Sequence, residues 1–439
     1  MLSALANRTY RHLILAQVIA LIGTGLATVA LGLLAFNLAG AYAGAVLGTA
    51  LAIKMIAYVT VAPVAAAFAE RLPRRTMLVT LDIVRAGVAV LLPFVSEVWQ
   101  VYILIFVLQS ASAAFTPTFQ ATIPDVLPDE KDYTRALSLS RLAYDMESVA
   151  SPLLAAALLT VVSFNTLFLG TVVGFVVSAL LVVSVLLPSP RPSAPRGIYD
   201  RTTRGMRIYL KTPRLQGLLA LTFAVSAAGS MVIVNTVVLV QSVFGLEQQQ
   251  TALALAAFGT GSMAAAFALP KLPDRFADRP VMSFGAGILT TAMLAGSVLP
   301  GYVPLLALWV VVGIGYSVTQ TPTGRLIRRS AHPEDRPALF AAQFALSHAT
   351  WLVTYPLAGW LGAKAGLPAA FLVMAGIAAV GLAMGLRLWP ANDPDELEHS
   401  HHDLPAGHPH VQAATAMPDG YVHTHAFVVD AEHVIWPGR

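Results

Sequence analysis

Long apolar blocks run along almost the whole chain, and short polar segments separate them. A membrane-spanning helix needs about 20 mostly apolar residues. Twelve blocks meet that requirement, so the pattern predicts an all-α membrane protein with twelve transmembrane helices in two six-helix halves. The first six lie at residues 12–38, 43–68, 76–96, 99–122, 136–162 and 165–187. The second six lie at residues 215–243, 250–270, 280–299, 302–324, 337–361 and 367–389.

Composition supports this prediction. Charged residues make up 11% of the 439 residues, whereas soluble domains contain about 25%. The chain has no cysteine, which excludes disulfides, thiolate metal sites and a cysteine nucleophile. It also lacks a His-Glu-x-x-His motif and a glycine-rich loop in a strand–helix context. We therefore expect no enzyme activity, no cofactor and no nucleic-acid partner.

Basic residues are concentrated in alternate loops between the predicted spans, and only Lys364 is found among the other loops. Cytoplasmic loops carry the excess of Lys and Arg. The alternation predicts a multi-pass protein of the plasma (inner) membrane with both termini in the cytoplasm. We expect it to act as a monomer whose surroundings are the lipid bilayer.

The two halves of the chain show an internal repeat. "ERLPRRTML" begins at Glu70, and the similar "DRFADRPVM" begins at Asp274, 204 positions later. "TPT" occurs at residues 116–118 and again, 205 positions later, at residues 321–323. The repeat predicts an N-terminal half at 1–187, a Pro- and Arg-rich linker at 188–214, a C-terminal half at 215–389 and a tail at 390–439. Transporters built from such repeats place the substrate between the halves, near the membrane midplane.

The segment "AAFAERLPRRTM" resembles the loop signature of the major facilitator superfamily, although it departs from that signature at Ala66 and Pro73. The resemblance implies the major facilitator fold, with this loop as a gating latch rather than a substrate site. A plain cytoplasmic loop would explain the arginines, but not the acid before them or its echo in the second half. The implied latch residues are Glu70, Arg71, Arg74, Arg75, Asp274, Arg275 and Arg279.

Ionisable residues interrupt the apolar pattern of span 136–162. Glu147 would lie roughly 16 Å from the start of the span, near the middle of the bilayer. A charge at that depth costs about 2.5–3.5 kcal/mol on insertion scales and usually marks function. Arg141 and Asp145 share one helix face, as either a structural pair or part of the site. Glu147 shares another face with Tyr144, which we expect to line the cavity.

Three other spans add candidates for the pathway of substrate and protons. Lys54 or Arg85 could be the counter-ion of Glu147, although Arg85 could instead pair with Asp82. His348 is either a site residue or a satisfied interior group. A carboxylate at this depth can hold a proton and exchange it for a cation, which is the chemistry of proton-coupled antiport. The pathway candidates are Glu147, Asp145, Arg141, Tyr144, Lys54, Arg85 and His348.

The tail is rich in histidine with interleaved acids. Histidine-rich tracts are typical of metal binding, and imidazole suits Zn, Cu, Fe and Ni. The alternative is a solvated tail of low complexity. The segment "YVHTHAFVVDAEHVIWP" alternates enough to suggest a small hairpin. The predicted metal ligands are His399, His401, His402, His408, His410, His423, His425 and His433.

This tail, together with "SRLAYDMESVASP" and "LAIKMIAYVTVAP", is similar to the nickel- and cobalt-resistance exporters of the superfamily. The resemblance implies proton-coupled efflux of Ni²⁺, or of Co²⁺, as small cationic substrates. Lys54, Arg85 and Arg141 would repel a dication unless each is paired. Export of an organic molecule or a siderophore-like chelate therefore stays open, as does a membrane metal sensor that does not transport.

Overall fold

A computed structural model describes most of the chain, and every structural statement below concerns the described residues. These are 4–69, 72–188, 198–269, 277–332, 335–394, 396–401, 405, 408–411, 414–418, 420–430, 433 and 436. Within some helices only the backbone is described, which applies to Arg141, Tyr144 and Asp145.

Twelve long helices confirm the predicted fold class. Those of the first half are α1 (Arg8–Ala39), α2 (Ala43–Ala69), α3 (Arg74–Leu91), α4 (Val98–Val126), α5 (Glu130–Leu158) and α6 (Phe164–Val183). Those of the second half are α8 (Pro213–Val237), α9 (Gln248–Ala268), α10 (Asp278–Gly296), α11 (Tyr302–Gln320), α13 (Arg336–Ala365) and α14 (Leu367–Leu388). Eight segments of the described chain are long and apolar enough to cross a membrane by length and composition.

Two shorter helices were not predicted. Helix α7 (Ile198–Lys211) lies in the predicted linker, and Gly205 brings it so close to α13 that a Cβ there would collide with the carbonyl of Ala338. Helix α12 (Thr323–Arg329) follows a break at Pro322, which caps it. Proline removes one helix hydrogen bond. The second "TPT" therefore ends α11 and starts a separate helix.

Local signals in the sequence explain several helix starts. The Asn7 side chain accepts the main-chain N–H of Tyr10 at the start of α1, at 3.1 Å. Asp129 accepts the N–H of Asp132 at the start of α5, at 3.0 Å. Glu97 and Gln100 form a reciprocal capping box at the start of α4. Such caps satisfy the main-chain donors that a helix leaves without partners at its first turn.

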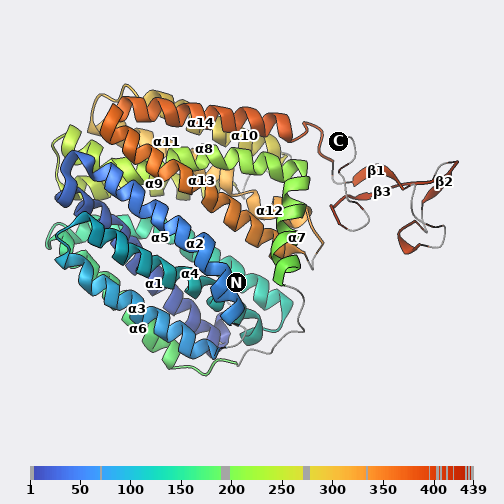
Figure 1. Ribbon diagram of the computed structural model, residues 1–439, viewed down its shortest axis with the longest axis horizontal. Helices are drawn as coiled ribbons and strands as arrows, with labels where there is room; N and C mark the ends of the chain where they lie inside the picture. The colour runs from blue at the N-terminus through green and yellow to red at the C-terminus, as the bar shows by residue number, and fades with distance from the viewer. Residues whose placement is uncertain are drawn as a thin grey trace.

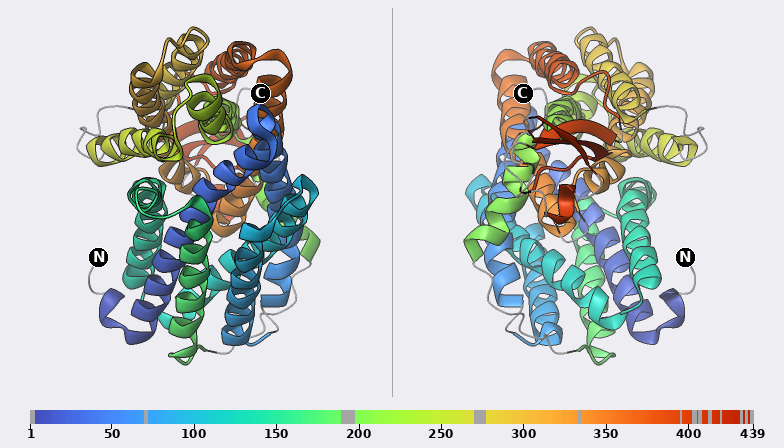
Figure 2. Two further views of the ribbon diagram at one scale, coloured as in Figure 1. Left: turned by 90° about the vertical axis from the view of Figure 1, so that its left-hand side faces the viewer. Right: turned by 90° about the vertical axis from the view of Figure 1, so that its right-hand side faces the viewer.

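The two sets of six helices lie one above the other (Figures 1 and 2). They meet where α2 packs on α13 and where α5 packs on α9. Near the start of α2 the contact is between glycines, since a Cβ on Gly359 would collide with the carbonyl of Gly44. A Cβ on Gly48 would lie 2.5 Å from the carbonyl oxygen of Tyr355. The backbones of α2 and α13 therefore touch at this end, which closes the bundle there.

The tail forms a small antiparallel sheet beyond one end of the bundle (Figure 1). Its strands β1 (Glu396–His401), β2 (Thr415–Met417) and β3 (Gly420–Ala426) lie in the order β1-β3-β2. His399 stands opposite His423 in the β1–β3 register. A hairpin within residues 421–437 was therefore the wrong pairing, because β3 pairs with the two strands that precede it.

Candidate functional site

The loops predicted to act as a latch share one arrangement in the two halves. Arg75, at the start of α3, donates to the carbonyl of Val183 at the end of α6. Arg279, 204 positions later at the start of α10, donates to the carbonyls of Leu386 and Trp389 at the end of α14, both at 2.8 Å. Each arginine thus ties the start of its half's third long helix to the end of the sixth.

A neighbouring ion pair also repeats, with its charges exchanged. Arg74 pairs with Asp125 in the first half. Asp278 pairs with Arg325 in the second half, with Arg325 Nε 3.0 Å from Asp278 Oδ1. Both halves thus have an ion pair here, but the basic residue begins the third long helix in the first half and the acidic residue begins it in the second. Glu70, Arg71, Asp274 and Arg275 lie outside the described residues.

Glu147 sits in the middle of α5 and is half-buried against α1. A Cβ on Gly25 of α1 would collide with Glu147 Oε1 and with Ser151 Oγ. Ser151 is fully buried and donates to the carbonyl of Ile22 at 3.4 Å. Gly25 is therefore the position that leaves room for the carboxylate, and Glu147 shares a face with Ser151, as the helical spacing requires.

Lys54, on α2, lies close enough to Glu147 for their charges to interact. Its Nζ is 5.8 Å from the centre of the Tyr58 ring, one helical turn along α2. The Tyr58 ring stacks on His348 of α13, with ring centres 5.4 Å apart and planes 7° from parallel. This intramembrane site, formed by Glu147, Lys54, Tyr58 and His348, joins helices of both halves.

His348 has a defined orientation within that site. Its Nδ1 lies 2.7 Å from the carbonyl oxygen of Phe344, one turn earlier on α13. Because a carbonyl can only accept, Nδ1 carries the proton, and the neutral ring keeps the lone pair on Nε2. The Phe344 ring lies against the imidazole, with centres 3.9 Å apart. Nε2 is thus the ring atom able to bind a cation or a proton.

Arg85 pairs with Asp82, one of the two partners that the sequence left open, the other being Glu147. It pairs with the fully buried Asp82, which also accepts the Ser178 hydroxyl at 2.8 Å. Its guanidinium lies over the rings of Phe115 and Phe175, 4.1 Å and 4.4 Å from their centres. This arrangement is that of a buried structural pair inside the first half. It leaves Lys54 as the cation beside Glu147.

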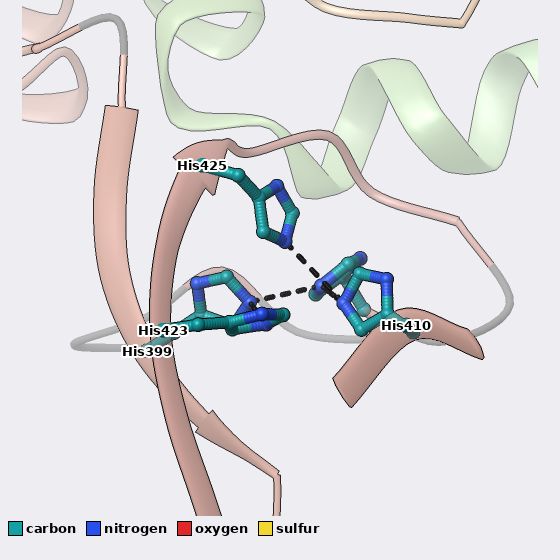
Figure 3. A group of neighbouring side chains, drawn as sticks. His399, His410, His423 and His425 are labelled. Atoms are coloured by element: carbon teal, nitrogen blue, oxygen red, sulfur yellow. Dashed lines mark hydrogen bonds between the residues drawn. The ribbon is translucent and has the colours of Figure 1, made fainter. Parts of the chain in front are cut away.

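Six of the eight tail histidines come together in one cluster, which we call the histidine centre. It consists of His399, His401, His410, His423, His425 and His433. Figure 3 shows four of these imidazoles turned toward one another, from both long strands and from the short helix η6 (Pro409–Val411). His408 lies next to the centre and accepts the N–H of His410 through Nδ1, whereas His402 is outside the described residues.

The Nε2 atoms of the centre lie at distances suited to a shared metal ion. The Nε2–Nε2 distances are 3.0 Å for His399–His433, 3.1 Å for His399–His423 and for His410–His433, and 3.2 Å for His410–His401. The His425–His410 distance is 3.3 Å. With metal–nitrogen bonds of about 2.1 Å, neighbouring ligands are about 3.0 Å apart in an octahedron and about 3.4 Å apart in a tetrahedron.

Three of these rings have their other nitrogen held by an acceptor. Nδ1 of His399 lies 3.0 Å from the carbonyl oxygen of Leu397, and Nδ1 of His425 lies 2.9 Å from that of Ala426. Nδ1 of His433 lies 3.0 Å from Asp430 Oδ1. Such acceptors fix the tautomer of metal-binding histidines and orient their rings. In the neutral rings, lone pairs of His399 and His433 then face each other, an arrangement that a bound cation stabilises.

The local environment favours neutral rings. Burial, followed by the proximity of neighbouring imidazoles, lowers the pKa of His401 and of His423 to about 4. The same causes, opposed in part by the bond to Leu397, lower the pKa of His399. Neutral imidazole is the form that binds a metal ion.

Acidic residues that hold the tail were missed by sequence reasoning. Asp393 binds Arg214 at 3.0 Å and accepts the Trp389 indole N–H at 2.9 Å. Asp430 bonds to both His433 and His332. A possible signal was the spacing of Trp389 and Asp393, four residues apart directly after the last span.

Comparison with known proteins agrees with this architecture. The family model described as "Major Facilitator Superfamily" matches residues 13–295 and 218–418. An uncharacterized MFS-type transporter of Bacillus subtilis (strain 168), YfiS, is 23% identical over 331 residues, which are 72% of this chain and 78% of that protein. Macrolide efflux protein A of Enterococcus faecalis is 25% identical over 152 residues, 32% of this chain and less than half (47%) of that protein.

Solved structures share the fold. The nucleoside transporter NupG superposes with a TM-score of 0.66 at 12% identity, covering 87% of this chain and 98% of that one. A bacterial homolog of the human lysosomal transporter Spinster, inward-facing and unoccupied, superposes with a TM-score of 0.68 at 14% identity, covering 87% and 96%. With its twelve long helices, its repeated loops and the family match over most of its length, the chain belongs to the Major Facilitator Superfamily and is a multi-pass membrane transporter.

Proposed function

We propose that the protein is a secondary active exporter that moves a divalent metal ion out of the cytoplasm in exchange for protons. Ni²⁺ is the first candidate and Co²⁺ the second. The observation that carries the proposal is the histidine centre, with its Nε2 contacts of 3.0–3.3 Å. Imidazole suits Ni²⁺ among other ions. The five histidines whose ligand atoms all lie within 4.8 Å of one another exceed the four ligands of a structural zinc site.

The side of the membrane follows from the basic loops. The excess of Lys and Arg assigns the loops that carry it, and with them both termini, to the cytoplasm of the inner membrane. The histidine centre then stands on the side from which an exporter takes its substrate. The relatives named macrolide efflux proteins favour the outward direction.

The intramembrane site supports exchange with protons. An ionised Glu147 compensates the charge of Lys54 and offers oxygen ligands to a cation, while His348 offers Nε2. A protonated Glu147 leaves Lys54 as an uncompensated positive charge, which repels a dication. Cation and proton therefore occupy the site alternately, and this exclusion couples their movements. Asp145, Arg141 and Tyr144, on the same helix, complete the proposed pathway.

The test uses purified full-length protein, acting as a monomer, in proteoliposomes with a Ni²⁺-sensitive dye inside. A pH gradient, more acidic inside, should drive Ni²⁺ into the lumen through molecules oriented with the tail outside. Collapse of the gradient with a protonophore should stop the uptake. Glu247→Gln, an exposed site before α9, is the matched control and should behave as the wild type. Uptake that ignores the gradient would disprove proton coupling.

An organic anion or a metal chelate is the second candidate substrate. Lys54 favours it because its charge attracts an anion, and the rings of Tyr58 and His348 beside it can stack on a planar group. The same vesicles distinguish the candidates. Uptake of a Ni²⁺ chelate without uptake of free Ni²⁺ would establish the second candidate. Tight binding of Ni²⁺ with no uptake of either would indicate a membrane sensor.

A further inference from the structure

Two of the contacts between the tail and the transmembrane bundle involve α12 or the loop that follows it. Arg329, at the end of α12, donates to the carbonyls of Asp393 and Pro394 at 2.6 Å and 2.9 Å. His332, three residues later, places Nε2 3.1 Å from Asp430 Oδ2. The tail therefore rests on the segment between α11 and α13.

Asp430 links this contact to the histidine centre. Its Oδ1 accepts the main-chain N–H of His433 at 2.7 Å and lies 3.0 Å from Nδ1 of the same residue. Its Oδ2 faces His332. One carboxylate thus orients a ring of the centre and holds the tail on the bundle. Because the carboxylate of Asp430 is rigid, a displacement of His433 also displaces the contact between Asp430 and His332.

A second connection passes through aromatic rings. Phe427 lies against the rings of His399 and His433, 5.0 Å and 4.7 Å between centres, and against Trp436 at 5.0 Å. The Trp436 ring lies 4.8 Å from the guanidinium of Arg214 near the start of α8. Phe427 and Trp436 therefore connect the histidine centre to α8, the first long helix of the second half.

The loop that contains His332 also binds the helix that connects the halves. Asp335 pairs with Arg204 of α7 at 2.8 Å. Tyr209 of α7 donates to the Gln343 side chain on α13. The loop between α12 and α13 lies between the tail and α7, where it can pass a movement of the tail to the connection between the halves.

We propose that the histidine centre is a regulatory metal site, which binds one divalent ion and thereby docks the tail on the α12–α13 loop. This inference rests on the proposed function, because it takes the exported ion as the regulator. Ligand atoms of His399, His410, His423, His425 and His433 all lie within 4.8 Å of one another. Their lone pairs repel one another without a cation, so the ion supplies folding free energy to the tail. Metal binding in the tail then raises transport, and His332 is the positioning residue that transmits it.

Hydrogen exchange of the full-length protein, measured by mass spectrometry with and without Ni²⁺, tests the docking. Ni²⁺ should slow exchange at least about tenfold in β1 and β3, and also in the peptide covering residues 326–332. In His332→Ala the protection of the strands should persist, whereas that of residues 326–332 should be lost. His332→Gln, which can still donate to Asp430, should restore it. A loop that is insensitive to Ni²⁺ in the wild type, or protected equally in His332→Ala, would overturn the inference.

Transport separates this inference from the proposed function. In proteoliposomes, His332→Ala should bind Ni²⁺ within about threefold of the wild type, yet lose the increase in rate that filling the tail produces. If the wild type moves no Ni²⁺ at all, the proposed function is wrong whatever the exchange data show. If both proteins transport with the same dependence on Ni²⁺, only the regulatory role is wrong.

Discussion

The intramembrane site and the histidine centre differ most in charge. Glu147 stands beside a lysine, in a site that joins both halves of the bundle. The histidine centre contains six imidazoles and has its acid, Asp430, outside the ring of Nε2 atoms. A dication is attracted to the second arrangement as it stands, but to the first only while Glu147 is ionised. The comparison assigns selection and sensing of the ion to the tail, and exchange with the proton to the membrane.

Glu147→Gln should have the largest effect, and it tests the membrane side of this comparison. The neutral amide leaves Lys54 uncompensated at all pH values, so proton-driven Ni²⁺ uptake should fall at least about 100-fold. Ni²⁺ binding by the tail should not change, as equilibrium dialysis of the purified protein would show. Uptake that keeps its dependence on the pH gradient would remove Glu147 from the mechanism.

His410→Ala tests the other site in this comparison, the histidine centre, and should weaken its binding of Ni²⁺. His410 makes three of the five Nε2 contacts, so its loss opens the centre. The affinity of the full-length protein for Ni²⁺ should fall by about 100-fold, and Asp430→Asn, which removes the group orienting His433, by about 10–100-fold. His12→Ala, at a partly exposed site on α1, is the matched control. Unchanged affinity in His410→Ala would mean that the ion binds elsewhere.

Lys54→Gln, alone and combined with Glu147→Gln, measures the charge interaction in the membrane. Each single variant leaves one charge without its partner, whereas the double variant removes both. The effects on the free energy of unfolding should be non-additive by about 0.5–3 kcal/mol, because the two charges interact. Thermal unfolding in detergent gives the comparison. Strict additivity would show that the two side chains do not interact.

Exchanging the charges of Asp278 and Arg325 should have the smallest effect. The first half already carries the reversed pair, Arg74 with Asp125. The double variant Asp278→Arg, Arg325→Asp should therefore remain within about 1 kcal/mol of the wild type in stability, because Arg325 is more than half exposed and solvent screens the pair. Each single variant should be less stable than the double. A double variant less stable than both singles would show that the two loops are not equivalent.

Much of the fold could be predicted from the sequence, since apolar blocks of membrane length are an unambiguous pattern. Helix α7 could not, because Arg and Lys fill its polar face and its stability comes from contacts such as Tyr209 with Gln343. The break at Pro322 could not be predicted either. Whether a proline bends a helix or ends it depends on packing that the sequence does not display.

The sequence indicates which residue types form the candidate sites, but not which of these residues contact one another. Alternation along a strand places His399 and His401 on one side of β1, and His423 and His425 on one side of β3. His410 and His433 reach the same centre from a short helix and a loop, so no spacing rule connects them. Likewise, helical periodicity placed Lys54 and Arg85 equally well as partners of Glu147. The contacts of Arg85 with Asp82 and two aromatic rings decide between them.

The position of Asp393 decides where the tail can be cut. This carboxylate belongs by sequence to the segment after the last helix, yet it pairs with Arg214, of which only 2% is exposed. A shortened protein that ends at Asn392 deletes a carboxylate partner of a guanidinium inside the second half, and breaking a buried ion pair costs about 3–5 kcal/mol. Poor expression of that protein would then report a damaged bundle. A stop codon placed after Pro394 keeps the pair, although it removes Trp436, which also lies against Arg214, together with the sheet and its histidines.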